Sequence, residues 1–179
     1  MATETTRWAI DPTHSVIGFK VKHLVISTVK GTFKEFSGQL ESKGEDFDGA
    51  SATFEASIDS IDTGVEDRDA HLKSADFFDA ENHPKLMFKS TTFKKSGEGE
   101  YDLEGELTIR GTTKTVQLKA THGGTAVDPY GQTKAGFEIE GTINRKEFGL
   151  EWNAVTEAGN IVVADKIHLN LDVQVTQEA

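Results

Sequence analysis

Histidine offers the widest chemistry in this chain, because an imidazole can ligate a metal or transfer a proton near neutral pH. No two histidines stand at the i, i+4 spacing that places two ligands on one helix face. With no cysteine to complete a ligand set, we expect neither a metal site nor a cofactor. The six histidines are His14, His23, His71, His83, His122 and His168.

A second group, Asp11, His14 and Ser15, contains the residue types of a nucleophilic hydrolase. Asp11 is followed by Pro12, a pair that is typical of a turn at the start of a strand. The chain also has no Gly-x-Ser-x-Gly segment that would raise a serine on a strained turn. The pattern therefore predicts a turn and argues against hydrolysis.

A third group, Arg68, His71 and Asp76, could meet the polar head of a ligand. The alternative is a solvated helix face with local charge pairs, each worth a few tenths of a kcal/mol. Sequence spacing leaves both interpretations open.

This third group lies in the one long segment that does not read as strand or turn. Thr63 stands three residues before Glu66, which is the spacing of a capping box, and a helix is predicted over about residues 65–74. Its apolar content is low, so it cannot be a core element. We expect it to cover one end of a β structure, with Phe77 and Phe78 anchoring it.

The rest of the chain alternates apolar and polar residues with period two, the pattern of half-buried strands. A change of parity between Phe33 and Phe36 predicts a bulge or bend. The inward parity switches between Ile109 and Val116, as a hairpin with an even-numbered loop requires. The two flanking strands are therefore predicted to pair directly. A surface loop is expected over 123–131, and a turn of helix at 145–150 is expected to close the barrel end opposite the cover. The predicted strands cover residues 16–25, 29–42, 52–58, 84–93, 101–110, 116–120, 137–143 and 161–175.

About eight amphipathic strands in sequence predict an all-β, antiparallel meander with one apolar face. Closure into an eight-stranded barrel hides that face, whereas a two-sheet sandwich is the alternative. Such a barrel is either filled by its own side chains or holds one small ligand. Gly105 and Gly141 fall on the inward parity, where they either leave space for a ligand or bend the strands.

Composition limits the partners. The 179 residues, 36% of them hydrophobic, suit a single domain over 1–179. Thirty acidic against nineteen basic residues give a net charge of −11, which opposes binding to nucleic acid or to anionic membranes. No apolar run approaches the roughly 20 residues that span a bilayer. Because no apolar stretch precedes Trp8, a cytoplasmic location is expected; a homodimer is left open.

Several segments, in order along almost the whole chain, resemble the YceI-like, polyisoprenoid-binding family. The resemblance implies an extended, lipocalin-like barrel whose apolar pore holds an isoprenoid or another long-chain amphiphile, although many members carry a secretory signal and are periplasmic. The matching segments are WAIDPTHS at 8–15, FKVKHL at 19–24, GTF at 31–33, TG at 63–64, RDAHL at 68–72, DFFD at 76–79, Pro84, GELTIRGTTK at 105–114 and INRKEFG at 143–149.

Two functions follow as hypotheses. The first is a protein that binds, stores or transports a long apolar molecule without catalysis, with Arg68, His71 and Phe77 of the cover near one end. The second is a small barrel enzyme that acts on an isoprenoid or lipid, with the inward His23 as acid or base. The predicted lining is Phe19, Val21, Phe54, Ile58, Phe88, Leu103, Leu107, Phe137, Ile139, Leu169 and Leu171.

Overall fold

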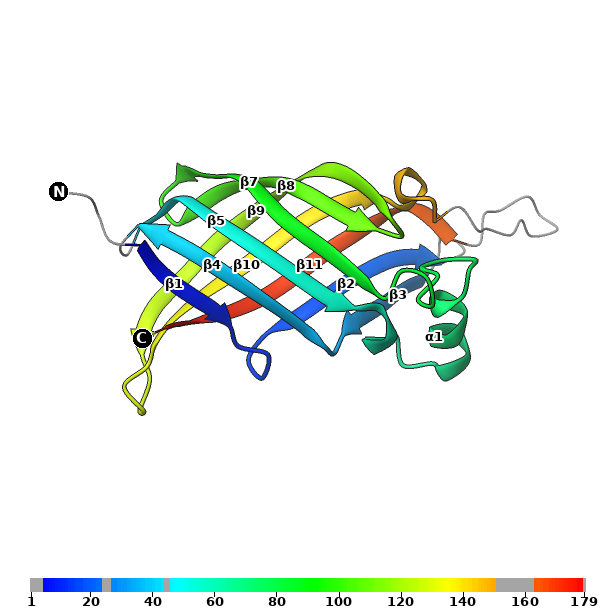
Figure 1. Cartoon of the computed structure of the whole chain (residues 1–179), viewed down its shortest axis with the longest axis horizontal. Coiled ribbons are helices and arrows are strands. Elements are labelled where there is room, and N and C mark those ends of the chain that lie inside the picture. Colours follow the sequence, from blue (N-terminus) through cyan, green and yellow to red (C-terminus); the bar gives the residue numbers. More distant parts are fainter. Residues whose placement is uncertain (1–4, 24–26, 44–45, 151–162, 179) are drawn as a thin grey trace.

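The chain forms a closed antiparallel β-barrel with an α-helix at one end (Figure 1). This computed structural model describes residues 5–23, 27–43, 46–150 and 163–178. The elements are β1 (Thr5–Ile10), β2 (Val16–His23), β3 (Ser27–Phe33), β4 (Phe36–Lys43), β5 (Asp46–Ser57), the 3-10 turn η1 (Ile58–Ser60), β6 (Ile61–Asp62), α1 (Glu66–Lys73), β7 (Lys85–Gly97), β8 (Glu100–Ile109), β9 (Thr112–Val127), β10 (Thr133–Asn144), the 3-10 turn η2 (Arg145–Phe148) and β11 (Val163–Gln177).

Eight strands close the ring, in the order β1, β4, β5, β7, β8, β9, β10 and β11, and β11 pairs back onto β1. β2 pairs with the same β11 further along, so β1 and β2 act as one broken strand. β3 and β4 form a second broken strand, with β3 paired to β2 and β4 paired to β1. The predicted eight-stranded barrel is confirmed.

Both breaks coincide with signals in the sequence. The predicted change of direction between Phe33 and Phe36 is the point at which β3 ends and β4 begins. The predicted turn after Asp11 separates β1 from β2, and the Asp11 carboxylate accepts hydrogen bonds from the backbone N–H and the hydroxyl of Thr13. Side chains that bond the backbone two residues on are a common means of forming such turns.

The hairpins follow the prediction in one case and differ in the other. β8 and β9 are direct partners joined by Arg110 and Gly111, whose φ values of 51° and 73° are those of a two-residue type I′ turn. The expected long loop over 123–131 is wrong, because β9 continues to Val127 and pairs with β10 from Thr133. Only residues 128–132 form the connection.

The helix lies where it was expected, but its first turn is built differently. Val65 is the N-cap and makes no side-chain capping hydrogen bond, so the predicted capping box with Glu66 is wrong. Thr63 instead donates its backbone N–H to the Asp69 carboxylate, over 2.9 Å. No residue of α1 is buried, and no helix among the described residues is long and apolar enough to cross a bilayer.

The turn η2 also differs from the expectation that it closes the opposite end. Phe148 and Leu150, at and just after this turn, pack in the same buried cluster as Phe77, which follows α1. Figure 1 shows both elements at the same end of the barrel, beside the end of β2. Strand parity carries no information about which ends of distant segments meet.

Candidate functional site

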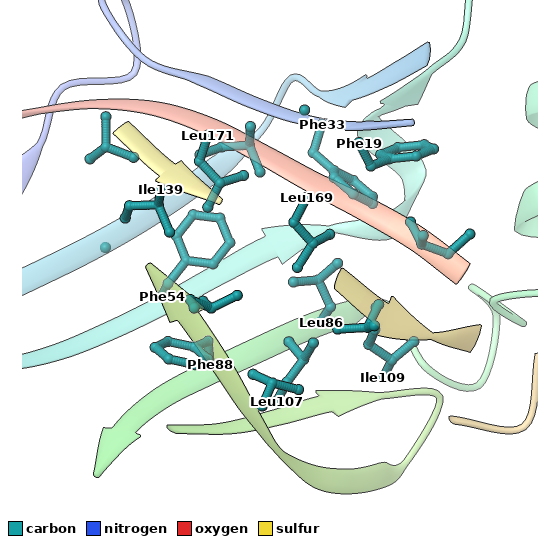
Figure 2. A pocket seen from close by; sticks show the side chains of 18 of the residues that line it. Phe19, Phe33, Phe54, Leu86, Phe88, Leu107, Ile109, Ile139, Leu169 and Leu171 are labelled. Atoms are coloured by element: carbon teal, nitrogen blue, oxygen red, sulfur yellow. The ribbon is translucent and has the colours of Figure 1, made fainter. Parts of the chain in front are cut away.

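A cavity runs through the barrel interior and is the principal candidate site. Its volume is about 240 Å³, and the surface that faces it is apolar. Figure 2 shows side chains from several strands converging on this space, among them Phe54, Phe88 and Leu169. Phe54, Phe88, Ile139, Leu169 and Leu171 point inward yet are only partly buried. Inward apolar side chains that retain accessible surface indicate a hollow rather than a filled core.

Aromatic side chains close the end of the barrel away from α1. Trp8, Phe47, Phe93, Tyr101 and Phe137 come from five different strands and are all buried. The rings of Phe47 and Phe137 meet edge to face with centroids 4.9 Å apart, and those of Trp8 and Phe47 lie 5.5 Å apart. Such contacts between aromatic rings add to the stability gained from area burial. This end therefore acts as a packed floor beneath the cavity.

The other end of the cavity is covered by less firmly packed elements. Leu72 of α1 and the following Phe77 and Phe78 line the cavity. Phe77 is buried, whereas Leu72 and Phe78 are partly exposed. The Phe78 ring meets Phe33 of β3 edge to face at 6.2 Å. Because α1 itself buries no residue, this end is the weaker closure of the two.

Among the described residues, Arg145 is the charged one that lines the cavity. Its side chain is almost completely buried and donates hydrogen bonds to the backbone carbonyls of Leu150 (2.6 Å) and Ala164 (2.9 Å). Burial lowers the pKa of this guanidinium, and the nearby Asp165 carboxylate opposes that shift. These contacts tie η2 and the segment after it to the start of β11, which is a structural role.

The space above the inward glycines Gly105 and Gly141 is filled by side chains of neighbouring strands. A Cβ on Gly141 would lie 2.2 Å from Leu118 Cδ2, and one on Gly105 would lie 2.5 Å from the Phe88 ring. A large side chain on a neighbouring strand therefore lies over each glycine and against the barrel wall. This arrangement keeps both side chains out of the centre of the cavity.

Most of the residues predicted as lining do line the cavity, although whether they bind a ligand stays a prediction. Ile58 does not line the cavity, because it begins η1, just after β5, and is fully buried in the surrounding core. His23 pairs with Ser27 and Val163 through the backbone, but its side chain lies outside the described part of the structure. The predicted residues found in the lining are Phe19, Val21, Phe54, Phe77, Phe88, Leu103, Leu107, Phe137, Ile139, Leu169 and Leu171.

Arg68 and His71 do not reach the cavity. Arg68 donates to the hydroxyl and the carbonyl of Thr63, over 2.7 and 2.6 Å. His71 lies 3.0 Å from the Asp76 carboxylate and packs edge to face on Phe77. The structure therefore uses this group for local contacts around α1.

Asp11, His14 and Ser15, the residues of a possible hydrolase, do not form a triad. His14 Nδ1 lies 2.8 Å from the Asp11 carboxylate, which also accepts from Lys134 over 2.9 Å. Ser15 instead exchanges hydrogen bonds with the backbone of Gln174, on β11. Among the described residues, no hydrogen bond joins His14 to Ser15. Nowhere in the described part of the chain do three His, Asp or Glu side chains come together in a group that could hold a metal.

Sequence reasoning missed other lining residues that strand alternation could have found. Some belong to predicted strands and share their inward parity, and others follow the helix or precede the first break. The main additions are Ile10, Phe33, Leu40, Leu72, Phe78, Leu86, Phe93, Ile109, Val116, Leu118, Ile143, Ile167, Val173 and Val175.

Comparison with known proteins agrees with this architecture. The chain is 39% identical over 163 residues to the UPF0312 protein SERP2314 of Staphylococcus epidermidis, covering 90% of this chain and 92% of that protein. The crystal structure of the Campylobacter jejuni YCEI protein is 32% identical, covers 89% of this chain and 91% of its own, and superposes with a TM-score of 0.74.

A polyisoprenoid binding domain from Saccharophagus degradans shares the fold, with a TM-score of 0.66 at 13% identity over 96% of this chain and 98% of that domain. The sequence model of the YceI-like domain matches residues 8–175, nearly the whole barrel. The chain belongs to the YceI-like family.

Proposed function

We propose that this protein binds a long-chain isoprenoid or another lipid-like amphiphile in the barrel cavity, and stores or transports it without changing it chemically. The observation that carries the proposal is the wholly apolar cavity inside a closed barrel, lined by inward residues that are only partly buried. An apolar cavity holds no favourable site for water, so an apolar guest is its natural content. The polyisoprenoid binding domain with the same fold supports an isoprenoid as the ligand class.

The apolar lining is the source of the expected affinity. At about 0.8 kcal/mol for each buried methylene, a tail of about 20 carbons that entered the cavity completely would contribute roughly 16 kcal/mol. The cost of association is about 4–15 kcal/mol. Burial of the tail therefore offsets the cost of association, and binding does not require a polar anchor.

The test is the identity and fate of the bound molecule. An organic extract of the purified protein is analysed by mass spectrometry, and the stripped protein is then offered a prenyl alcohol and a phospholipid. We expect recovery of a long-chain apolar compound, uptake of the prenyl chain at about one per barrel, and an unchanged mass after incubation. An empty extract together with no uptake contradicts the proposal. A product that His23→Ala no longer forms would favour the enzyme instead.

A further inference from the structure

The outer wall of β2, β3 and β11 carries basic side chains in an arrangement that the fold does not require. Lys20 of β2 is directly opposite Lys30 of β3 on one side and opposite His168 of β11 on the other. Lys20 and Lys30 point outward, because their neighbours Phe19 and Gly31 are on the inner face. Like charges placed directly opposite each other destabilise a strand pair.

Lysines elsewhere on the wall show the usual arrangement. Lys89 is opposite Glu106, and Lys94 is opposite Asp102, in the pairing of β7 with β8. Lys119 of β9 is also opposite Asp102. Lys20 and Lys30 thus depart from a pattern that the same barrel follows on its other side.

Two more lysines extend the row toward the end that α1 covers. Lys22 hydrogen-bonds to the Thr28 hydroxyl over 3.0 Å, and Lys166 is exposed on β11. Lys20, Lys22, Lys30 and Lys166, called here the lysine row, form no ion pair among the described residues.

Acidic side chains flank the lysine row on both sides. Asp165, next to Lys166, lies 3.4 Å from Lys146 Nζ and 4.0 Å from Arg145, and these two cations offset its charge. Glu140 and Asp172 stand further along β10 and β11, away from the α1 end, and the first turn of α1 is itself acidic. The positive charge is therefore local to the outer wall of β2, β3 and β11.

We infer that the lysine row is a docking surface for an anionic lipid bilayer, from which the barrel takes up its ligand or to which it returns it. The inference rests on the proposed function, since a long apolar molecule resides in a membrane and has to cross only a short distance to the cavity. The inner face of the same strands, at Phe19, Val21 and Leu169, lines that cavity. Flexible lysines act as point charges and suit a surface of mobile head groups better than a fixed partner geometry.

The overall charge of −11 does not prevent such a contact. Eight strands about 4.8 Å apart give a circumference of at least about 38 Å, so the opposite wall is roughly 12 Å or more away. The Debye length at physiological ionic strength is about 8 Å, so salt screens the acids of that wall. Each lysine near an anionic surface strengthens binding about fivefold. Four lysines then give an attachment that is strong enough to orient the barrel and weak enough to release it.

The test uses the full chain and vesicles of phosphatidylcholine with or without 30% phosphatidylglycerol, separated by sedimentation, at low and high salt. We expect binding to the anionic vesicles at low salt only. Lys20→Gln with Lys30→Gln should lower that binding about 25-fold, at about fivefold per lysine. The matched control, Lys89→Gln with Lys94→Gln, changes the net charge equally and should leave binding unchanged.

Stability gives a second measurement, because removing two opposed charges should keep or raise the thermal midpoint of the Lys20 and Lys30 variant. Absence of binding to anionic vesicles, equal binding to neutral ones, or equal loss in both double variants overturns the inference. So does capture by soluble polyglutamate in preference to the vesicles, which would indicate an acidic protein partner. If lipid is still recovered from a protein that ignores vesicles, the proposed function stands and only the docking surface is wrong.

Discussion

Replacing Ile139 by tryptophan separates a hollow barrel from a filled one. Ile139 lies on β10 between Ala120 of β9 and Leu171 of β11, and its side chain lines the cavity while remaining partly accessible. The tryptophan side chain has about six non-hydrogen atoms more than the sec-butyl side chain of isoleucine. Those atoms enter the space that we assign to the ligand.

The two cases differ in the size of the expected change in thermal midpoint. In a filled core, overpacking costs about 1–3 kcal/mol, and each kcal/mol lowers the midpoint of a chain this long by about 2–4 °C. The stripped Ile139→Trp protein would then melt roughly 2–12 °C below the stripped parent. In a hollow barrel we expect a change below about 2 °C. The ligand loses the space of about six carbons, worth roughly 5 kcal/mol at 0.8 kcal/mol each, or more than a thousandfold in affinity.

The assay compares thermal midpoints of stripped proteins with lipid recovered from untreated ones. Glu138→Trp is the control, because this neighbouring residue is exposed on the outer face of β10. We expect the control to keep both its lipid and its midpoint. A large fall in the midpoint of stripped Ile139→Trp, or full retention of lipid by that variant, refutes the hollow at this level and removes the main physical support for the proposed function.

Three further predictions concern the turn between β1 and β2, the wall of the barrel and its cover. Asp11→Asn removes the charged partner of Lys134 and should cost about 2 kcal/mol at pH 7. Hydrogen bonds from Lys134 and His14 hold the pKa of Asp11 below its ordinary value of about 3.9. This stabilisation is therefore present above pH 4 and is lost as the pH falls toward the folded-state pKa. The unfolding free energies of parent and variant, measured by urea titration, should converge in acid, and a difference that stays constant with pH contradicts the assignment. Gly141→Ala should turn Leu118 into the cavity and lower the lipid recovered per barrel; unchanged lipid shows that the wall adapts elsewhere. Amide exchange at residues 70–73 should be faster than at residues 103–107 in the stripped protein and should slow when lipid is added, whereas equal protection in both states contradicts a weak cover.

The sequence by itself determined which side chains face inward, because alternation along a strand is a local property of the backbone. Leu103 and Leu107 of β8 and Ile139 of β10 were predicted as lining from parity alone, and the cavity contains all three. The breaks at Asp11 and after Phe33 were equally legible, since turn-forming side chains and a change of parity act over only a few residues. The motifs along the chain also pointed to the family that the comparisons show.

Only the tertiary structure decided how the ends of the barrel are closed. β1 meets β11 through residues more than 160 positions apart, and η2 joins α1 at one end through contacts that no local pattern specifies. Arg68 and His71 belong to local hydrogen bonds instead of the cavity, because helix spacing gives the face of a side chain but not its partner. The opposition of Lys20 to Lys30 likewise depends on strand register, which arises when distant segments pair and their side chains settle against one another.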